Sequence, residues 1–250
     1  MLDESWSTVI NKEKAWHDAR RSTVGSSDIP IILGISPYKT PLDLWKIKTG
    51  KVHPEESNFA QQRGKDMEPI ARDWFCERMG YYYEPKDFKI GRHTASLDGY
   101  NEVFHTGVEI KFNGKENHEL AKQGKVPPVY LAQVHWQYYV ACLEGAHYLS
   151  YQEGNSALVE VAKPEAHVIT MLQHYADAFL DLVDTVTQPP LTDRDYLEAE
   201  DPTGKVIEFQ NTKDKKLRLD IIKMAEELNH PRVMFGTLKV IKTAKGWMLK

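Results

Sequence analysis

The chain has 250 residues, of which 41% are hydrophobic and 27% are charged, and its formal net charge is −4 at pH 7. This is the composition of a globular protein large enough for one sizeable core or two small ones, and it excludes collagen-like, disordered and mini-protein classes. The longest apolar stretch, residues 29–35, is far below the roughly 18 residues that cross a bilayer. The two cysteines, Cys76 and Cys142, are too few for a cysteine-ligated zinc or iron–sulfur site.

The charge is unevenly distributed along the chain. Residues 1–202 carry 21 Lys and Arg against 31 Asp and Glu, whereas residues 203–250 carry 11 against 5. The basic C-terminal region is suited either to contact with phosphates or to an ordinary solvated helix face and hairpin. The acidic main body is compatible with nucleic acid, because a site that collects divalent metal must itself be rich in carboxylates. The acidic N-terminus lacks the basic start and apolar segment of a signal peptide, so we expect a cytoplasmic protein.

Hydrophobic periodicity, capping residues and turn signals predict an order of helices and strands. The expected helices cover residues 29–33, 41–49, 63–79, 131–142 and 164–183. The expected strands cover residues 81–89, 94–97, 108–112, 147–152 and 157–161, and a hairpin joins the last two. This order predicts an α/β (α+β) domain over residues 1–200. A basic C-terminal extension, residues 201–250, is expected to consist of a small helix and a hairpin.

Charged residues on two of the predicted strands form the most informative pattern. Side chains at positions i and i+2 of a strand share a face, so Glu109 and Lys111 point to one side while Ile110 enters the core. If the two strands pair, Asp98, Glu109 and the backbone carbonyl of Ile110 form an oxygen site of the kind that Mg²⁺ or Mn²⁺ prefers. Lys111 can then orient a water and neutralise charge on a phosphoryl oxygen, which indicates phosphodiester hydrolysis. The alternative is a simple cross-strand salt bridge.

Two polar residues at the starts of predicted helices are suited to the same site. Glu68 lies beside the apolar stripe of the helix at 63–79, where it can face the sheet. Its alternative role is that of a first-turn acid favoured by the helix dipole. Gln133 begins the next long helix near the strand ends, and its alternative role is that of an exposed helix-forming residue.

A segment near the N-terminus combines two arginines with a serine pair. Arg20 and Arg21 precede Ser26 and Ser27, which come immediately before the apolar run at 29–33. Serine caps, free backbone N–H groups and a guanidinium together make an anion cradle suited to a terminal phosphate. A plain capped helix is the alternative.

Together these segments resemble the YqaJ-like viral recombinases and the lambda-type alkaline exonucleases, a branch of the PD-(D/E)xK nuclease superfamily. The motifs that carry the resemblance lie in the family order within about residues 16–161: Arg21-Ser-Thr-Val-Gly-Ser-Ser-Asp28, Gly34-Ile-Ser-Pro-Tyr-Lys-Thr-Pro-Leu-Asp-Leu-Trp45, Arg63-Gly64 to Glu68, Leu97-Asp98-Gly99, Glu109-Ile-Lys111 and Tyr130-Leu-Ala-Gln133-Val134. The Pro-Asp pair of the superfamily is absent, since Leu97 precedes Asp98. The resemblance implies a restriction-endonuclease-like core with a central mixed sheet flanked by helices.

The activity that this resemblance implies is that of a Mg²⁺-dependent 5′→3′ exonuclease. Such an enzyme degrades one strand of linear double-stranded DNA and leaves 3′ single-stranded overhangs for phage-type homologous recombination. The resemblance also implies two metal ions, with Mn²⁺ as a substitute for Mg²⁺, and a DNA substrate with a 5′-phosphate. The resemblance further implies a single-strand annealing protein as partner and assembly into a homotrimeric ring. If a phage or prophage encodes the chain, the implied location is the bacterial cytoplasm. No membrane partner is expected, because no apolar stretch is long enough to cross a bilayer.

Individual roles carry over by position in the motifs. The resemblance assigns the metal to Asp98, Glu109, Glu68 and the backbone carbonyl of Ile110. Lys111 would position the attacking water, and Gln133 would hold that water or the scissile phosphate. The 5′-phosphate is assigned to Arg20 or Arg21 together with Ser26 or Ser27.

Two other functions fit the residues. An endonuclease of the same fold would cut closed circles, whereas the arginine and serine cradle suits a free DNA end. A non-catalytic DNA-binding recombination protein would have a degenerate site, whereas Asp98, Glu109 and Lys111 are all present.

Overall fold

A computed structural model of the chain describes residues 21–52, 59–199, 215–235, 238–243 and 246–250. The chain divides into two compact units, Met1–Pro189 and Pro190–Lys250. Within the described ranges, none of the helices has the length and hydropathy of a membrane span.

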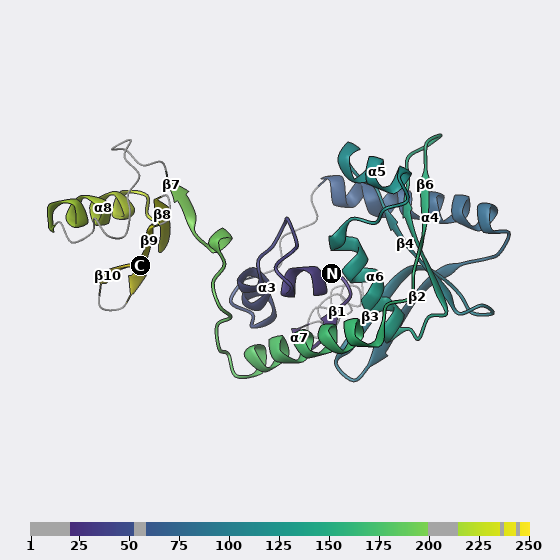
Figure 1. Ribbon diagram of the computed structural model, residues 1–250, viewed down its shortest axis with the longest axis horizontal. Coiled ribbons are helices and arrows are strands. Elements are labelled where there is room, and N and C mark those ends of the chain that lie inside the picture. The colour runs from purple at the N-terminus through teal and green to yellow at the C-terminus, as the bar shows by residue number, and fades with distance from the viewer. Residues whose placement is uncertain (1–20, 53–58, 200–214, 236–237, 244–245) are drawn as a thin grey trace, which may run out of the picture. The chain divides into compact units, whose positions relative to one another are not determined.

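A six-stranded mixed sheet forms the centre of the described part of the first unit (Figure 1). Its strands are β1 (Val24–Gly25), β2 (Glu84–Ile90), β3 (His93–Asn101), β4 (Thr106–Lys111), β5 (Gly145–Ser150) and β6 (Ala157–Val161). The order is β1-β3-β4-β5-β6, and β2 pairs with β3. The pairs β1 with β3 and β4 with β5 are parallel, and the other pairs are antiparallel.

One edge of β3 is shared by two strands that leave a gap between them. β2 runs along one edge of β3 and pairs with it at both Thr94 and Tyr100. β1 also pairs with Thr94, and β4 also pairs with Tyr100, so both of these strands lie on the other edge of β3. Between them the carbonyls of Thr94, Ser96 and Asp98 accept hydrogen bonds from side chains. Buried backbone groups need partners, so this gap must be filled by neighbouring helices.

Helices cover both faces of the sheet. On one face, Ala71 and Phe75 of α4 (Phe59–Met79) pack against Val108 and Ile110 of β4. Successive strand residues point to opposite faces, so Glu109 points to the other face, where α6 (Pro128–Val140) lies. The third long helix, α7 (Ala166–Asp184), packs against α6 and against the short helices α2 (Ile29–Ile32) and α3 (Pro41–Lys48) (Figure 1).

The ends of α3 follow from local sequence. Thr40 accepts a hydrogen bond from the backbone N–H of Asp43, whose carboxylate accepts one from the backbone N–H of Thr40, and Pro41 occupies the first turn. Gly50 follows the helix with a φ of 71°, in the left-handed region that favours glycine. The helix predicted at 41–49 is therefore confirmed, within one residue.

The second unit has its own sheet and core. α8 (Lys215–Glu227) packs on a four-stranded sheet of order β10-β9-β8-β7, formed by β7 (Leu197–Ala199), β8 (Arg232–Phe235), β9 (Leu238–Thr243) and β10 (Gly246–Leu249). The core residues are Ile221, Ala225, Val233, Phe235, Leu238, Val240 and Leu249. The predicted helix and hairpin are present, but the unit begins about ten residues before the expected boundary at 200/201, because β7 pairs with β8.

Two elements of the first unit were absent from the sequence-based prediction. α5 (Lys115–Lys122) is polar in sequence and buries only His118 and Ala121, so it lacks the apolar stripe that marks an amphipathic helix. β1 has two residues, too few to show an alternating pattern. The other helices and strands of this unit occur where the sequence predicts them, with ends that shift by a few residues.

A buried ion pair joins α3 to the segment between β1 and α2. The Lys48 ammonium lies 2.9 Å from the Asp28 carboxylate, and side-chain exposure is only 4% for Lys48 and 9% for Asp28. Lys48 also donates to the carbonyl of Thr23 at 2.6 Å, and Asp28 accepts from the backbone N–H of Gly25 at 2.9 Å. These contacts set the conformation of the residues that leave β1.

Replacing Lys48 with methionine leaves the Asp28 carboxylate buried without its counter-ion. We expect Lys48→Met to lower the free energy of unfolding by about 3 kcal/mol, measured by urea denaturation. Lys46→Met, on the same helix, removes a more exposed lysine 4.0 Å from Asp43 and should change stability by less than about 0.5 kcal/mol. Equal losses in the two variants would contradict the role given to the buried pair.

Candidate active site

The end of the β3–β4 ladder brings two acidic residues together. The last paired residues are Gly99 and Val108, so Asp98 and Glu109 come next on the two strands. There a carboxylate oxygen of Asp98 accepts the backbone N–H of Ile110 at 2.7 Å. The two strands thus meet as the sequence analysis required for an oxygen site.

Glu109 is a buried carboxylate, 1% exposed, and side chains from two elements hold it. Gln133 and Gln137 of α6 donate to its two oxygens at 2.7 and 2.5 Å. The ammonium of Lys111 on the same strand also donates to it. Three donors around one buried carboxylate fix its orientation, since an unpaired buried charge is costly.

The electrostatics of the site reflect two acidic groups in a confined space. Burial and the negative charge of Glu109 raise the pKa of Asp98 to about 8, although Lys111 opposes the rise. Burial disfavours the charged form of Lys111, but the charges of Glu109 and Asp98 outweigh this and hold its pKa above the ordinary value. Lys111 therefore stays an ammonium at neutral pH, and the carboxyl groups lie where added positive charge is favourable.

Glu68 reaches the site through an arginine. Arg72, one turn further along α4, lies 3.0 Å from the Glu68 carboxylate and donates to the carbonyl of Asp98 at 2.7 Å. Glu68 is near enough to Asp98 for its charge to contribute to the raised pKa of that group. Glu68 therefore lies at the edge of the site, on the α4 side of the sheet.

The hydrogen bonds of β4 show to which side the backbone of Ile110 points. In a strand the N–H and C=O of one residue point to the same side, and the next residue points to the other. The N–H of Ile110 meets Asp98, whereas the carbonyl of Lys111 accepts from Tyr151 next to β5. The carbonyl of Ile110 therefore points to the β3 side of the strand, the side on which its N–H meets Asp98.

The chemistry of these donors fits a hard divalent cation. Asp98, Glu109 and the Ile110 carbonyl present oxygen atoms, which Mg²⁺ and Mn²⁺ prefer, and two adjacent carboxylates favour the entry of positive charge. Across the described ranges, no three His, Cys, Asp or Glu side chains gather closely enough to bind one ion by themselves. The backbone carbonyl and water would therefore have to complete the coordination.

The expected phosphate cradle is only partly described. Arg20 lies outside the described residues. Arg21 is exposed, and its guanidinium group lies beside Gly50, just after the end of α3. The guanidinium carbon is 3.8 Å from the position that a Cβ would take on this glycine. Ser26 is buried and Ser27 is exposed. Asp28, and not a serine, occupies the N-cap of α2, where its side chain makes no capping hydrogen bond.

Sequence reasoning missed two residues that complete this site. Gln137 is 1% exposed and links Glu109 to the carbonyl of Ser96. Arg72 links Glu68 to Asp98. Each lies four residues after a predicted site residue, Gln133 or Glu68, and so on the same helix face. That spacing was the signal available in the sequence.

Comparison with known families identifies the first unit. A family model of the YqaJ-like viral recombinase domain matches residues 15–144. The chain belongs to this family. It is also similar to the uncharacterized protein YqaJ of Bacillus subtilis (strain 168), with 33% identity over 135 aligned residues; the match covers 51% of this chain and 41% of that protein. The chain thus matches less than half the length of this YqaJ relative.

Solved structures share the fold of this YqaJ-like chain. The alkaline exonuclease LHK-Exo of Laribacter hongkongensis superposes with a TM-score of 0.57 at 21% identity, over 70% of this chain and 94% of that one. A phage-related exonuclease of Haemophilus somnus 129PT superposes with a TM-score of 0.51 at 13% identity, over 66% of this chain and 94% of that one. The predicted family and fold, a mixed sheet flanked by helices, are confirmed.

Gln137→Leu should destabilise the protein, because it removes a donor from the buried Glu109 carboxylate. We expect a loss of about 2 kcal/mol in the free energy of unfolding, measured by urea denaturation. In a Glu109→Gln background the same substitution should cost less, since no buried charge then lacks its donor. Additive losses in the double variant would show that Gln137 does not act through Glu109.

Proposed function

We propose that this YqaJ-like protein is a Mg²⁺-dependent 5′→3′ exonuclease that acts on linear double-stranded DNA and leaves 3′ overhangs for recombination. The observation that carries the proposal is the Asp98, Glu109 and Lys111 arrangement where the β3–β4 ladder ends. It combines oxygen donors for a divalent cation with a fixed ammonium, within the span that matches the family.

Each part of the arrangement has a chemical role in phosphodiester hydrolysis. Asp98, Glu109 and the Ile110 carbonyl would hold Mg²⁺, with Mn²⁺ as a substitute and Glu68 near a second ion. The bound ions would stabilise charge on the phosphoryl oxygens. Lys111 is already protonated, so it acts as a hydrogen-bond donor that orients the attacking water and offsets developing negative charge.

Gln133 is placed to assist Lys111. Its amide nitrogen donates to Glu109, which leaves its carbonyl oxygen as an acceptor for the attacking water. Gln133 would therefore hold the water through this oxygen, or the scissile phosphate through the remaining N–H of its amide nitrogen.

The N-terminal segment supports an enzyme that acts at a DNA end. β1 runs parallel to β3. Ser26 and Ser27, which follow β1, therefore continue in the same direction in which β3 continues to Asp98. Serine hydroxyls, with Arg20 or Arg21, are suited to a 5′-phosphate, which an internal phosphodiester does not present. Family membership alone supports the homotrimeric ring and the annealing partner, and both remain parts of the proposal.

The direct test is digestion of 3′-labelled linear duplex with 5′-phosphate or 5′-hydroxyl ends, beside a covalently closed circle, in Mg²⁺ or EDTA. We expect Mg²⁺-dependent degradation of the 5′-phosphorylated strand, slower degradation of the 5′-hydroxyl strand, and an intact circle. Cutting of the circle would replace the proposal with an endonuclease. No digestion in Mg²⁺ or Mn²⁺ would indicate a non-catalytic DNA-binding protein.

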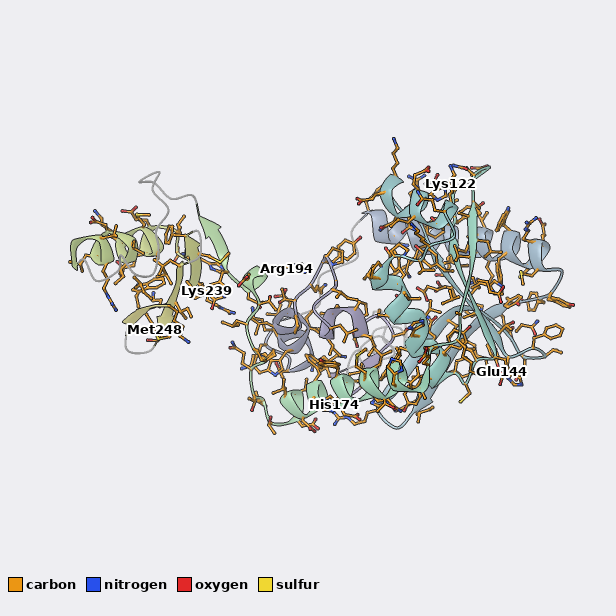
Figure 2. All side chains as sticks on the ribbon, viewed as in Figure 1. Lys122, Glu144, His174, Arg194, Lys239 and Met248 are labelled. Carbon is orange, nitrogen blue, oxygen red and sulfur yellow. The ribbon has the colours of Figure 1, made fainter. Side chains whose placement is uncertain are left out.

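Lys111→Ala should reduce the cleavage rate at least about 100-fold, because it removes the donor that orients the water and stabilises the transition state. Affinity for duplex DNA, measured by fluorescence anisotropy in Ca²⁺, should change little. The matched control is Lys122→Ala, which removes an exposed lysine of α5 (Figure 2). In the folded protein this lysine pairs only with the exposed side chain of Glu119 among the ion pairs of the described residues. Retained cleavage in Lys111→Ala would exclude the role proposed for this lysine.

A further inference from the structure

Lys111 has a second neighbour that the catalytic arrangement leaves unassigned. Its ammonium nitrogen lies 5.6 Å from the centroid of the Tyr130 ring, within the range of a cation–π contact. Tyr130 belongs to the first turn of α6, three residues before Gln133. One helix therefore supplies both a donor to Glu109 and an aromatic ring to Lys111.

A second tyrosine supports the ring. Tyr148 of β5 is completely buried, and its ring stacks on that of Tyr130 with centroids 5.5 Å apart and planes at 23°. Stacked rings of this kind stabilise each other by more than the burial of their apolar area alone provides. The ring of Tyr130 therefore rests on a fixed side chain of the central sheet.

Polar side chains in turn fix Tyr148. The amide nitrogen of Asn113 donates to the Tyr148 hydroxyl at 2.6 Å and to the Ser150 hydroxyl at 2.9 Å. A ring nitrogen of His118, on α5, lies 2.8 Å from the same Ser150 hydroxyl, and both Ser150 and His118 are buried. We call Asn113, Ser150 and His118 the polar anchor of Tyr148.

We propose that Tyr130 is a positioning residue that holds the Lys111 ammonium in its reactive orientation, and that Tyr148 with its polar anchor keeps the Tyr130 ring in place. This inference rests on the proposed nuclease function. A lysine side chain has several rotatable bonds, and the contact with Glu109 restrains its end on one side only. The ring limits the ammonium on another side, so that its remaining donors stay directed at the site.

A positioning role predicts a specific pattern of kinetic effects. Tyr130→Leu removes the ring and should lower kcat about 10-fold, while KM for duplex DNA stays within about 2-fold. Tyr130→Phe keeps the ring and should retain kcat within about 2-fold. The matched control is Tyr82→Leu, which removes a tyrosine that is 73% exposed and should leave kcat unchanged. An unchanged kcat in Tyr130→Leu, or an equal loss in Tyr130→Phe, would overturn the inference.

A second readout does not depend on nuclease activity. In protein labelled with ¹³C-lysine, the ε-CH₂ signal of Lys111 can be assigned by its loss in Lys111→Ala. A ring close to the ammonium shifts this signal, so we expect a clear change in Tyr130→Leu and only a small one in Tyr130→Phe. An identical signal in wild type and Tyr130→Leu would show that the ring does not hold Lys111.

The two readouts separate the inference from the function on which it rests. If the wild-type protein cleaves DNA and Tyr130→Leu cleaves it equally fast, the positioning role fails and the proposed function stands. If the wild-type protein cleaves no DNA, the proposed function fails, and the Lys111 signal still decides whether Tyr130 holds the ammonium.

Discussion

The structure of the site depends on the burial of one negative charge, the carboxylate of Glu109. A carboxylate with 1% exposure is stable only if donors surround it, and here two come from α6 and one from Lys111. Because Gln133 and Gln137 must both reach Glu109, the rotation and position of α6 over the sheet are tightly restricted. The same restriction places Tyr130, at the start of α6, over Lys111.

The second constraint is the gap along the edge of β3. β1 and β4 share this edge at its two ends, so the backbone carbonyls between them need side-chain partners. Trp136 and Gln137 supply them from one face of the sheet, and Arg72 supplies one from the other. A continuous ladder would leave no room for side chains here. The interruption therefore makes space for a polar site in the middle of the sheet. The carbonyls of Thr94, Ser96 and Asp98 along the gap all accept hydrogen bonds from side chains.

The family match covers the proposed active-site residues but not the strand that supports Tyr130. Residues 15–144 contain every proposed ligand and Lys111, together with α6. Tyr148, whose ring stacks on Tyr130, and Ser150, which belongs to the polar anchor of Tyr148, lie on β5 beyond that span. The support of the site thus depends on a strand whose parallel pairing with β4 places Ser150 opposite Lys111.

The sequence by itself determined the local features of this protein: the capped helix after Thr40, and the alternation that points Glu109 and Lys111 one way and Ile110 the other. These depend on neighbours within a few residues, so their pattern is visible in the chain. Only the tertiary structure decided the contacts of Gln137, which reach Ser96 and Glu109 across 41 and 28 residues, and the place of Tyr130. Such contacts follow from strand register and helix packing, which no local pattern specifies.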